Sequence, residues 1–296
     1  MRVALTGVSG FIGSFVARHL HEAGHQVTGL IRSSSRRDDV DPFVDRFAVG
    51  EQDDESAWPA LLEGAECVVH NSYDFGSSDP DHHLKSDLVG SIRLLSASAP
   101  RRFVYMSSVA VHHDIRPRWQ GLIDEDHPLR PCSPYGAIKA SVESHLWAAH
   151  YGEGRATCAL RPCGVYGIDR RLDRSIGYPI LASVSEGRPF RRQDGGKFVH
   201  VEDVAAATVG AVEREDANGQ AFNLVDCYAR WADWAKIAAD VLGVDADIDF
   251  STPASPENQF DMTATRSLGV GLNRGIEGIR RHLEELAGRM ELGPGR

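Results

Sequence analysis

Short apolar runs alternate with amphipathic stretches from the N-terminus to Tyr166. The run Val3–Leu5 predicts a buried strand, and from Phe11 the apolar positions recur at helical spacing as far as Gly24. The same alternation predicts further strands at Gln26–Ile31, Arg46–Val49, Cys67–His70, Arg102–Ser107 and Thr157–Arg161, and helices at Ser56–Glu63, Lys85–Ser98 and Ser133–His150. We therefore expect an α/β fold with a doubly wound parallel sheet and helices on both faces.

The pattern becomes irregular after Tyr166, which predicts a second, smaller α+β lobe in the C-terminal part of the chain. The helix predicted at Ser133–His150 has a serine in the N-cap position and Pro134 at its first position, both typical of a helix start. The last residues, Gly293–Arg296, are expected to form a frayed tail.

The first strand leads into the first helix through three glycines, Gly7, Gly10 and Gly13. Gly7 permits a tight turn, Gly10 allows the backbone to approach a pyrophosphate, and Gly13 allows the helix to pack close to the strand. Free N–H groups and the helix dipole favour an anion at such a turn. The turn therefore predicts a dinucleotide site, with the spacing G-x-x-G-x-x-G in place of G-x-G-x-x-G.

Composition narrows the choice of partners. The 296 residues have a formal net charge of −10, which argues against nucleic acid or an anionic membrane as the partner. No apolar run reaches the length of a membrane span, and the N-terminus enters a strand directly, so we expect no signal peptide. The five cysteines lack the spacing of a disulfide framework or a zinc site, which predicts reduced thiols and a cytoplasmic location.

Tyr135 and Lys139 are four residues apart on a predicted helix, which places both side chains on one face. A tyrosine hydroxyl has a pKa of about 10, and a neighbouring ammonium lowers it, so the pair predicts an acid–base group. Such pairs also occur on ordinary helix surfaces, and Ser108, at the end of a strand, is compatible with simple turn chemistry. The three residues together, after the glycine turn, favour the catalytic interpretation.

These residues lie in longer segments that resemble the extended short-chain dehydrogenase/reductases, in their NAD-dependent epimerase/dehydratase branch. The resemblance covers nearly the whole chain. The similar segments are Thr6–Gly13, Val104–Val111, Tyr135–Lys139, Leu160–Pro162, Val165–Gly167, Phe198–Ala205, Asp261–Gly269 and a last helix near Glu277–Leu286.

The resemblance implies a Rossmann-type sheet, a nicotinamide cofactor and hydride transfer at a carbinol or carbonyl carbon. It implies that Tyr135 is the acid or base, that Lys139 lowers the pKa of Tyr135 and holds the nicotinamide ribose, and that Ser108 orients the substrate oxygen. The expected domains are a dinucleotide-binding domain at 1–165 plus 199–226 and a substrate lobe at 166–198 plus 227–296. The expected cofactor contacts are Gly7, Ser9, Gly10, Phe11, Ile12, Gly13, Arg32, Ser33, Arg37, Glu51, Gln52, Asn71, Ser72, Tyr135, Lys139, Pro162 and Val165.

The loop after the second strand carries arginines and serines where an NAD-preferring relative places an acidic residue. Arg32, Arg36 and Arg37 suit a 2′-phosphate through charge-assisted hydrogen bonds. We therefore expect NADP(H) in preference to NAD(H). The alternative is a solvated basic loop balanced by Asp38 and Asp39.

Departures from the family pattern narrow the activity. Val109 and Ala110 replace the Asp–Glu pair of the branch's dehydratases and cannot transfer a proton, which argues against a 4,6-dehydratase. Gly164 and the segment Gly195–Lys197 lack the asparagine and the arginine that help to hold a sugar-nucleotide diphosphate. The residues that could replace those contacts are Lys197, Arg188, Arg191 and Arg192.

The same comparison leaves two smaller points. Asp87 replaces an asparagine, which puts the usual water-mediated proton path to Lys139 in doubt. No metal is expected, because the adjacent pairs His82-His83 and His112-His113 diverge and lack Asp, Glu or Cys at ligand spacing, as in solvated loops. His113 follows the serine strand, so for this histidine a place in the wall of a substrate pocket is the alternative to a solvated loop.

Three functions therefore stay open. The first is an NADP(H)-dependent oxidoreductase acting at a secondary alcohol, ketone or aldehyde of a sugar-like or other small carbonyl substrate. The second is a nucleotide-sugar epimerase or keto-reductase, and the third is a non-catalytic cofactor-sensing protein, which the complete Ser108–Tyr135–Lys139 trio disfavours. Family members often dimerise through two helices, here Lys85–Ser98 and Ser133–His150, although the core also needs the apolar faces of both.

Overall fold

The computed structural model describes residues 1–112 and 120–292, so His113 and the tail Gly293–Arg296 lie outside the described residues. The chain forms two compact units. The first comprises Met1–Pro162, Val204–Leu224 and Phe260–Val270, and the second comprises Cys163–Asp203, Val225–Gln259 and Gly271–Arg296.

The return of Phe260–Val270 to the first unit differs from the expected boundary, which placed all of 227–296 in the second lobe. Two hydrogen bonds hold this segment. The Asp261 N–H donates to the Ile123 carbonyl at 2.8 Å, and the Thr265 hydroxyl donates to the Asn223 carbonyl at 2.8 Å. These contacts join positions far apart in the sequence, so a local sequence pattern could not predict them.

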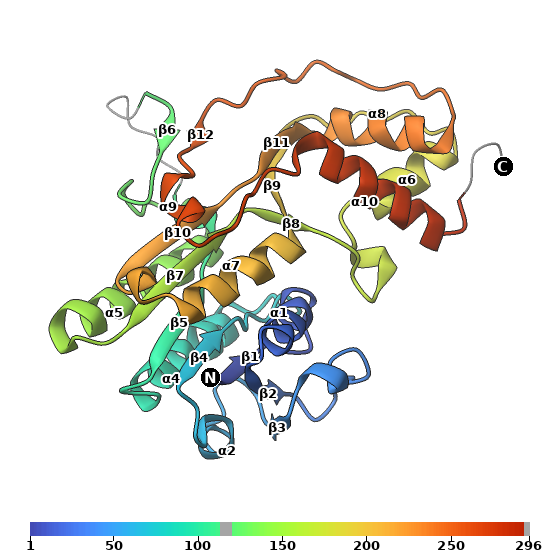
Figure 1. Cartoon of the computed structure of the whole chain (residues 1–296). Coiled ribbons are helices and arrows are strands. Elements are labelled where there is room, and N and C mark those ends of the chain that lie inside the picture. Colours follow the sequence, from blue (N-terminus) through green and yellow to red (C-terminus); the bar gives the residue numbers. More distant parts are fainter. Residues whose placement is uncertain (113–119, 293–296) are drawn as a thin grey trace. The chain divides into compact units, whose positions relative to one another are not determined.

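A seven-stranded sheet in the order β10-β7-β5-β4-β1-β2-β3 forms the centre of the first unit (Figure 1), and every neighbouring pair is parallel. The inner strands are short, mostly apolar runs, as burial on both faces requires, whereas the edge strand β3 is largely exposed. The strands are β1 (Arg2–Thr6), β2 (Gln26–Ile31), β3 (Arg46–Val49), β4 (Cys67–His70), β5 (Arg102–Met106), β7 (Thr157–Pro162) and β10 (Gln220–Leu224).

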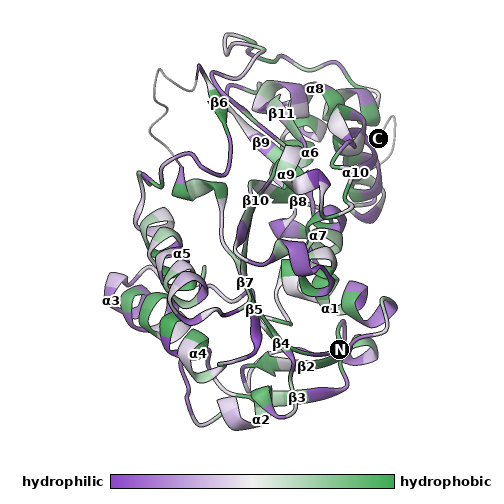
Figure 2. Ribbon diagram, turned by 60° about the vertical axis from the view of Figure 1, so that its left-hand side comes forward, coloured by the Kyte–Doolittle hydropathy of each residue, from purple (hydrophilic) through white to green (hydrophobic). Residues whose placement is uncertain are grey.

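Helices cover both faces of this sheet, which confirms the doubly wound arrangement. Figure 2 shows α4 and α5 on one face and α1 and α7 on the other. The helices of this unit are α1 (Phe11–Glu22), α2 (Trp58–Leu62), α3 (Pro80–His82), η2 (His83–Gly90), α4 (Ser91–Ala97), α5 (Pro134–Glu153), α7 (Val201–Glu213) and α9 (Thr263–Arg266). Short 3-10 turns are η1 (Asp41–Phe43), η3 (Val109–Val111) and η6 (Glu215–Ala217), and β6 (Leu122–Ile123) pairs with β12 (Gln259–Phe260).

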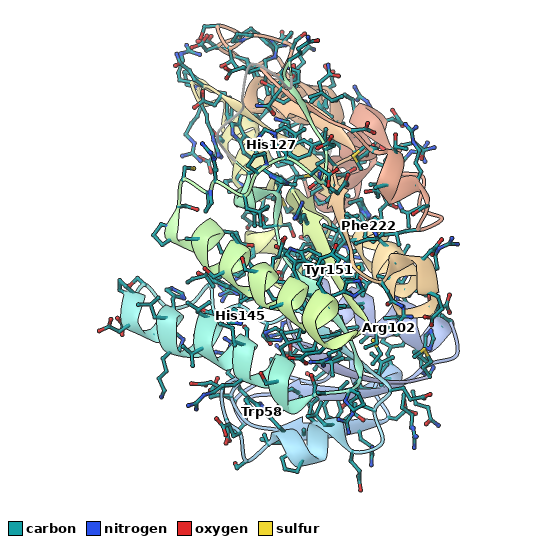
Figure 3. All side chains as sticks on the ribbon, turned by 90° about the vertical axis from the view of Figure 1, so that its left-hand side faces the viewer. Trp58, Arg102, His127, His145, Tyr151 and Phe222 are labelled. Atoms are coloured by element: carbon teal, nitrogen blue, oxygen red, sulfur yellow. The ribbon has the colours of Figure 1, made fainter. Side chains whose placement is uncertain are left out.

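The sequence predicted the helix α5 after β5 correctly, but it predicted the helix after β4 only in part. The Ser133 hydroxyl caps α5 by accepting from the Gly136 N–H at 3.1 Å, as expected. The helix expected at Lys85–Ser98 begins instead as the π-helix η2 and becomes α-helical only at Ser91. In Figure 3, α5 faces the viewer beside the η2–α4 helix. A π-turn is typical of functional sites.

The second unit combines a small sheet with three helices. Its strands are β8 (Gly164–Tyr166), β9 (Gly195–His200) and β11 (Cys227–Arg230), in the order β11-β9-β8. Its helices are α6 (Tyr178–Ser185), α8 (Trp231–Leu242) and α10 (Gly275–Arg289), and η5 (Leu172–Arg174) precedes α6. Tyr166, Phe198 and Trp234 are buried at its centre. Over the described residues, no helix has the length and apolar character needed to span a membrane.

Candidate functional site

The glycine turn after β1 has a shape that only glycine permits. Gly7 has a φ of +68°, and its carbonyl accepts the Gly10 N–H at 3.0 Å. A Cβ added at Gly13 would lie 2.0 Å from the Gly7 oxygen, so α1 packs against the turn without room for a side chain. Gly10 is exposed at the N-cap of α1, where no described side chain caps the helix.

The turn lies at the point where the strand order reverses, between β1 and β4. The Thr6 hydroxyl accepts the N–H groups of Asn71 and Ser72 at 3.1 and 3.2 Å, which joins the end of β4 to the end of β1. A Cβ at Gly7 would lie 3.1 Å from the Ser72 nitrogen. This bare backbone cradle fits a dinucleotide pyrophosphate, because open α/β sheets bind ligands at such a switch point.

A buried histidine, His70, contacts the Thr6 side chain that joins the ends of β1 and β4. The sequence analysis did not identify this residue. His70 Nδ1 lies 2.7 Å from the Thr6 hydroxyl, and its Nε2 lies 2.7 Å from the Ser91 hydroxyl. Burial, aided by the Lys139 charge, lowers the pKa of His70 to about 3, so its ring is neutral. The available signal was a histidine that ends the apolar run Cys67–His70.

The arginine loop after β2 divides into paired and unpaired charges. Arg36 lies 3.0 Å from Asp38, and Arg37 lies 3.8 Å from Asp41. Arg32 is exposed and has no carboxylate partner among the described residues. Of the three arginines, Arg32 is therefore the one whose charge is available to an anion.

Glu51 and Gln52 follow β3, and the structure separates them. Glu51 is exposed, whereas the Gln52 side chain is buried and its amide nitrogen donates to the Ser86 hydroxyl at 3.1 Å and to the Asp87 carboxylate. The Trp58 indole donates to the Gln52 carbonyl at 3.2 Å. The Gln52 amide nitrogen is thus bound to Ser86 and Asp87 in the interior, whereas Glu51 stays exposed.

Ser108, Tyr135 and Lys139 come together in the first unit. Ser108 acts on the Tyr135 side chain and lowers its pKa, and the Ser108 hydroxyl donates to the Pro162 carbonyl at 3.4 Å. The buried Lys139 ammonium donates to the Met106 carbonyl at 2.8 Å, so the end of β5 holds both the serine and the lysine.

Burial is the main influence on the pKa values of Tyr135 and Lys139. Burial raises the pKa of Tyr135, and the hydrogen bond with Ser108 opposes that rise. Burial lowers the pKa of Lys139 to about 8, against the attraction of Asp87 and Glu143. The Lys139 nitrogen lies 5.8 Å from the centre of the Tyr135 ring. Burial is thus the largest influence on the Tyr135 pKa in this structure, and the lowering of that pKa by Lys139 stays a prediction.

Two aromatic residues that sequence reasoning missed surround Tyr135. Tyr73 meets the Tyr135 ring edge-on at 4.8 Å between ring centres, and Phe75 lies 5.7 Å from the same ring. Phe75 is 78% exposed, so an apolar ring lies open to solvent beside the Tyr135 ring. Their only signal was proximity in sequence to Asn71 and Ser72.

A buried ion pair lies beneath the serine strand. Arg161 lies 2.6 Å from the fully buried Glu143, which also accepts from the Ser107 hydroxyl. Arg161 donates to His112 Nε2 at 3.2 Å, and His112 Nδ1 donates to the Pro128 carbonyl at 3.4 Å. Burial lowers the pKa of His112 to about 3, so this histidine is a neutral link in the network.

The histidine pair on α3 and η2 has partners that the sequence analysis did not assign. His82 lies 3.1 Å from Asp74, and His83 lies 2.6 Å from Asp87, so neither is a solvated loop histidine. Over residues 1–112 and 120–292, no group of three or more His, Cys, Asp or Glu side chains has the arrangement of a metal site.

The remaining predicted contacts fall into two sets. Ser9, Phe11 and Ile12 are half-buried around the glycine turn, and Ser33 is exposed in the arginine loop. Val165 belongs to the second unit, where it pairs with Val199 between β8 and β9.

Comparison with known proteins gives a consistent picture. A model of the NAD dependent epimerase/dehydratase family matches residues 3–224. A 4-hydroxy-2-methyl-3-oxo-4-farnesyl-3,4-dihydroquinoline-1-oxide ketoreductase from Stigmatella aurantiaca is 29% identical over 76% of this chain and 68% of its own. A UDP-glucose 4-epimerase from Streptomyces lividans is 27% identical over 72% of each chain. Among solved structures, a UDP-glucose 4-epimerase with UDP-glucose from Thermotoga maritima has a TM-score of 0.79 at 21% identity, covering 98% of this chain and 100% of its own.

Proposed function

Since the chain belongs to the NAD dependent epimerase/dehydratase family, we propose that it is an NADP(H)-dependent oxidoreductase that interconverts a carbonyl compound and its alcohol. Tyr135 is the acid or base on the substrate oxygen. The observation that carries the proposal is that the buried Lys139, held on the Met106 carbonyl, lies 5.8 Å from the Tyr135 ring, in the same unit as Ser108 and the glycine turn.

The first unit offers a residue for each part of the cofactor. The N–H groups at the glycine turn suit the pyrophosphate, Asn71 and Ser72 border that cradle, and Lys139 suits the nicotinamide ribose. Arg32 suits a 2′-phosphate because its charge has no carboxylate partner in the described chain. When bound, the nicotinamide supplies or accepts the hydride.

Proton transfer falls to Tyr135. In the reducing direction its hydroxyl gives a proton to the oxygen of the substrate carbonyl, while Ser108 donates a hydrogen bond to the same oxygen. The raised pKa of Tyr135 keeps the hydroxyl protonated at neutral pH, which favours reduction. In the oxidising direction, the phenolate must form before it can accept the proton of the alcohol.

Spatial restraints in the second unit weigh against a sugar nucleotide. A Cβ at Gly164 would lie 3.0 Å from the Lys197 carbonyl and 3.2 Å from the Phe198 ring, so an asparagine at this position requires its neighbours to move. Three of the arginine and lysine residues that could replace the missing contacts already have partners. The pairs are Arg188–Glu186, Arg191–Asp247 and Arg192–Trp231.

The surroundings of the trio support a carbonyl substrate with an apolar part. Phe75 presents an exposed ring beside Tyr135, and ring faces bind apolar groups. The similarity to a ketoreductase from Stigmatella aurantiaca supports this class, and the similarity to epimerases keeps the nucleotide-sugar epimerase as second candidate. Val109 and Ala110 form η3 directly after Ser108 and offer no group for dehydration.

Replacement of Tyr135 by phenylalanine tests the mechanism. We expect the wild type to oxidise NADPH in step with reduction of one or more members of a panel of small ketones and aldehydes. Tyr135→Phe should reduce kcat by about 10²- to 10⁴-fold, because general acid catalysis contributes that much. Calorimetric binding of NADPH should stay within a few-fold of the wild type.

Tyr151→Phe is the matched control, since Tyr151 is 77% exposed near the end of the same helix. Full turnover in Tyr135→Phe would contradict the mechanism. Conversion of UDP-glucose without net use of added cofactor would favour the epimerase.

Arg32→Asp tests the cofactor preference. Loss of a hydrogen bond to a charged group costs about 1.5–3 kcal/mol, so we expect the Kd for NADPH to rise roughly tenfold to a hundredfold while the Kd for NADH is unchanged or lower. Calorimetry with both cofactors measures this. Arg36→Asp should have a small effect because Arg36 already pairs with Asp38. Equal affinity of the wild type for NADH and NADPH would overturn the assignment of Arg32.

A further inference from the structure

His83 is held between two hydrogen-bond acceptors. Its Nδ1 lies 2.6 Å from Asp87 Oδ2, and its Nε2 lies 3.1 Å from the Ser77 carbonyl oxygen. A carbonyl oxygen cannot donate, and a neutral imidazole carries only one N–H. Both contacts are satisfied together when the ring is an imidazolium and Asp87 is a carboxylate.

The other contacts of Asp87 favour the ionised carboxylate. Its Oδ1 accepts from the Gln52 amide and from the Asp74 N–H at 3.1 Å, and hydrogen bonds to a charged carboxylate stabilise that form. The carboxylate is almost fully buried on η2, the π-helical turn at the start of the helix. A buried charge of this kind needs a counter-charge.

Two cations act on this carboxylate from different elements. His83 pairs with it directly, and Asp87 attracts the Lys139 ammonium on α5. The further charged groups are the Asp74 carboxylate, which pairs with His82 at 3.1 Å, and Glu143, which also attracts Lys139. Contact with Asp87 raises the pKa of His83, in agreement with an imidazolium.

The His83 ring also contacts the aromatic wall of the trio. It stacks on Tyr73 at 5.3 Å between ring centres, with an interplanar angle of 14°. Tyr73 in turn meets Tyr135 edge-on at 4.8 Å, and the Lys139 nitrogen lies 5.3 Å from the Tyr73 ring. A change at His83 is therefore transmitted both through charge and through packing.

We infer that His83 is a positioning residue of the reaction, an imidazolium that neutralises Asp87 and holds Tyr73 against Tyr135. Its effect on catalysis rests on the proposed function, whereas its protonation state does not. Without the charge at His83, Asp87 acts on Lys139 uncompensated and stabilises the protonated form of Lys139. The pH above which carbonyl reduction declines then moves upward.

The first test is nitrogen-detected NMR of the histidine rings in the full-length chain. We expect both His83 nitrogens to be protonated at neutral pH. Asp87→Asn should lower the titration midpoint of His83 by about one pH unit or more, because its ionised partner is removed. An unprotonated His83 nitrogen in the wild type at neutral pH, or an unchanged midpoint in Asp87→Asn, would overturn the inference whatever the enzyme's substrate is.

The second test is the pH profile of kcat/KM in His83→Gln, which retains a donor toward Asp87 but loses the charge. We expect the alkaline limb to move upward by about half a pH unit or more. The control is His82→Gln. The native His82 side chain is 38% exposed and pairs with Asp74, so the alkaline limb of this variant's pH profile should stay where it is in the wild type. An equal loss of activity at every pH would show a merely structural role and contradict the inference. Full turnover in Tyr135→Phe, together with a doubly protonated His83 ring in the NMR experiment, would refute the proposed function but not the inference about His83.

Discussion

At the scale of single residues, the candidate site rests on charges buried beneath it. Glu143 is fully buried on α5 and accepts from Arg161 Nε at 3.0 Å and from the Ser107 hydroxyl. Ser107 precedes Ser108, so this ion pair holds the backbone that carries the candidate catalytic hydroxyl. Burial of both partners means that neither can exchange its counter-charge for water.

Glu143→Gln should therefore destabilise the fold strongly. Breaking a buried ion pair costs about 3–5 kcal/mol, since the remaining guanidinium stays buried without its counter-charge. Urea unfolding at neutral pH measures the change in the free energy of unfolding. Glu284→Gln, at an exposed position on α10, should change it by less than about 0.5 kcal/mol. A loss below about 1 kcal/mol for Glu143→Gln would show that Arg161 finds another partner.

At the scale of elements, the unit β1–turn–α1 depends on backbone contact. The helix begins where the Gly10 N–H meets the Gly7 carbonyl, and Gly13 is pressed against that same carbonyl. The turn therefore tolerates no side chain at Gly13, and the position of the first N–H groups of α1 follows from this close packing.

Gly13→Ala should displace α1 from the turn. Its Cβ would lie 2.0 Å from the Gly7 oxygen, and overpacking of this kind costs about 1–3 kcal/mol. We expect that loss in urea unfolding, together with at least tenfold weaker NADPH binding by calorimetry. Gly152→Ala is the matched control in α5, where nothing lies within 4 Å of an added Cβ and alanine favours the helix by up to about 1 kcal/mol. Wild-type affinity in Gly13→Ala would refute the role of the turn.

At the scale of the whole molecule, both units contain histidines that burial keeps neutral. Burial lowers the pKa values of His70 and His112 in the first unit to about 3, and that of His200 in the second to about 4. An unfolded histidine has a pKa of about 6.5. His83 acts in the opposite direction, because its pKa is raised.

The fold should therefore lose stability in mild acid. Below about pH 6.5 the histidines of the unfolded chain bind protons, whereas His70, His112 and His200 of the folded chain stay neutral. This difference lasts until the pH approaches the folded pKa values of these three residues. Each such histidine costs about 1.4 kcal/mol per pH unit in this window. Urea unfolding at pH 7 and pH 5.5 measures the fall.

In His70→Gln the free energy of unfolding should fall less between pH 7 and pH 5.5, by about the contribution of one histidine. His145→Gln, on the exposed face of α5 (Figure 3), should leave it unchanged. Equal stability at both pH values would contradict the neutral state of these rings.

Local patterns predicted most elements of the first unit and the family. The bounds of β2, β3 and β4 agree with the prediction, and for the fully buried β4 the reason is that a buried parallel strand is a continuous apolar run between polar loops. The match over residues 3–224 confirms the family resemblance. The π-turn of η2 was beyond such reasoning, since the apolar spacing of Lys85–Ser98 is that of an ordinary helix and the buried Asp87 contacts partners distant in sequence.

The sequence by itself determined the parallel sheet, the glycine turn and the candidate trio, because spacing along one strand, turn or helix places those groups. Only the tertiary structure decided what surrounds them. It commits the Gln52 amide to Asp87, pairs Asp87 with His83, places Tyr73 and Phe75 on Tyr135, and raises the pKa of Tyr135 by burial. These properties depend on desolvation and on contacts between segments far apart in the chain, which no local pattern encodes.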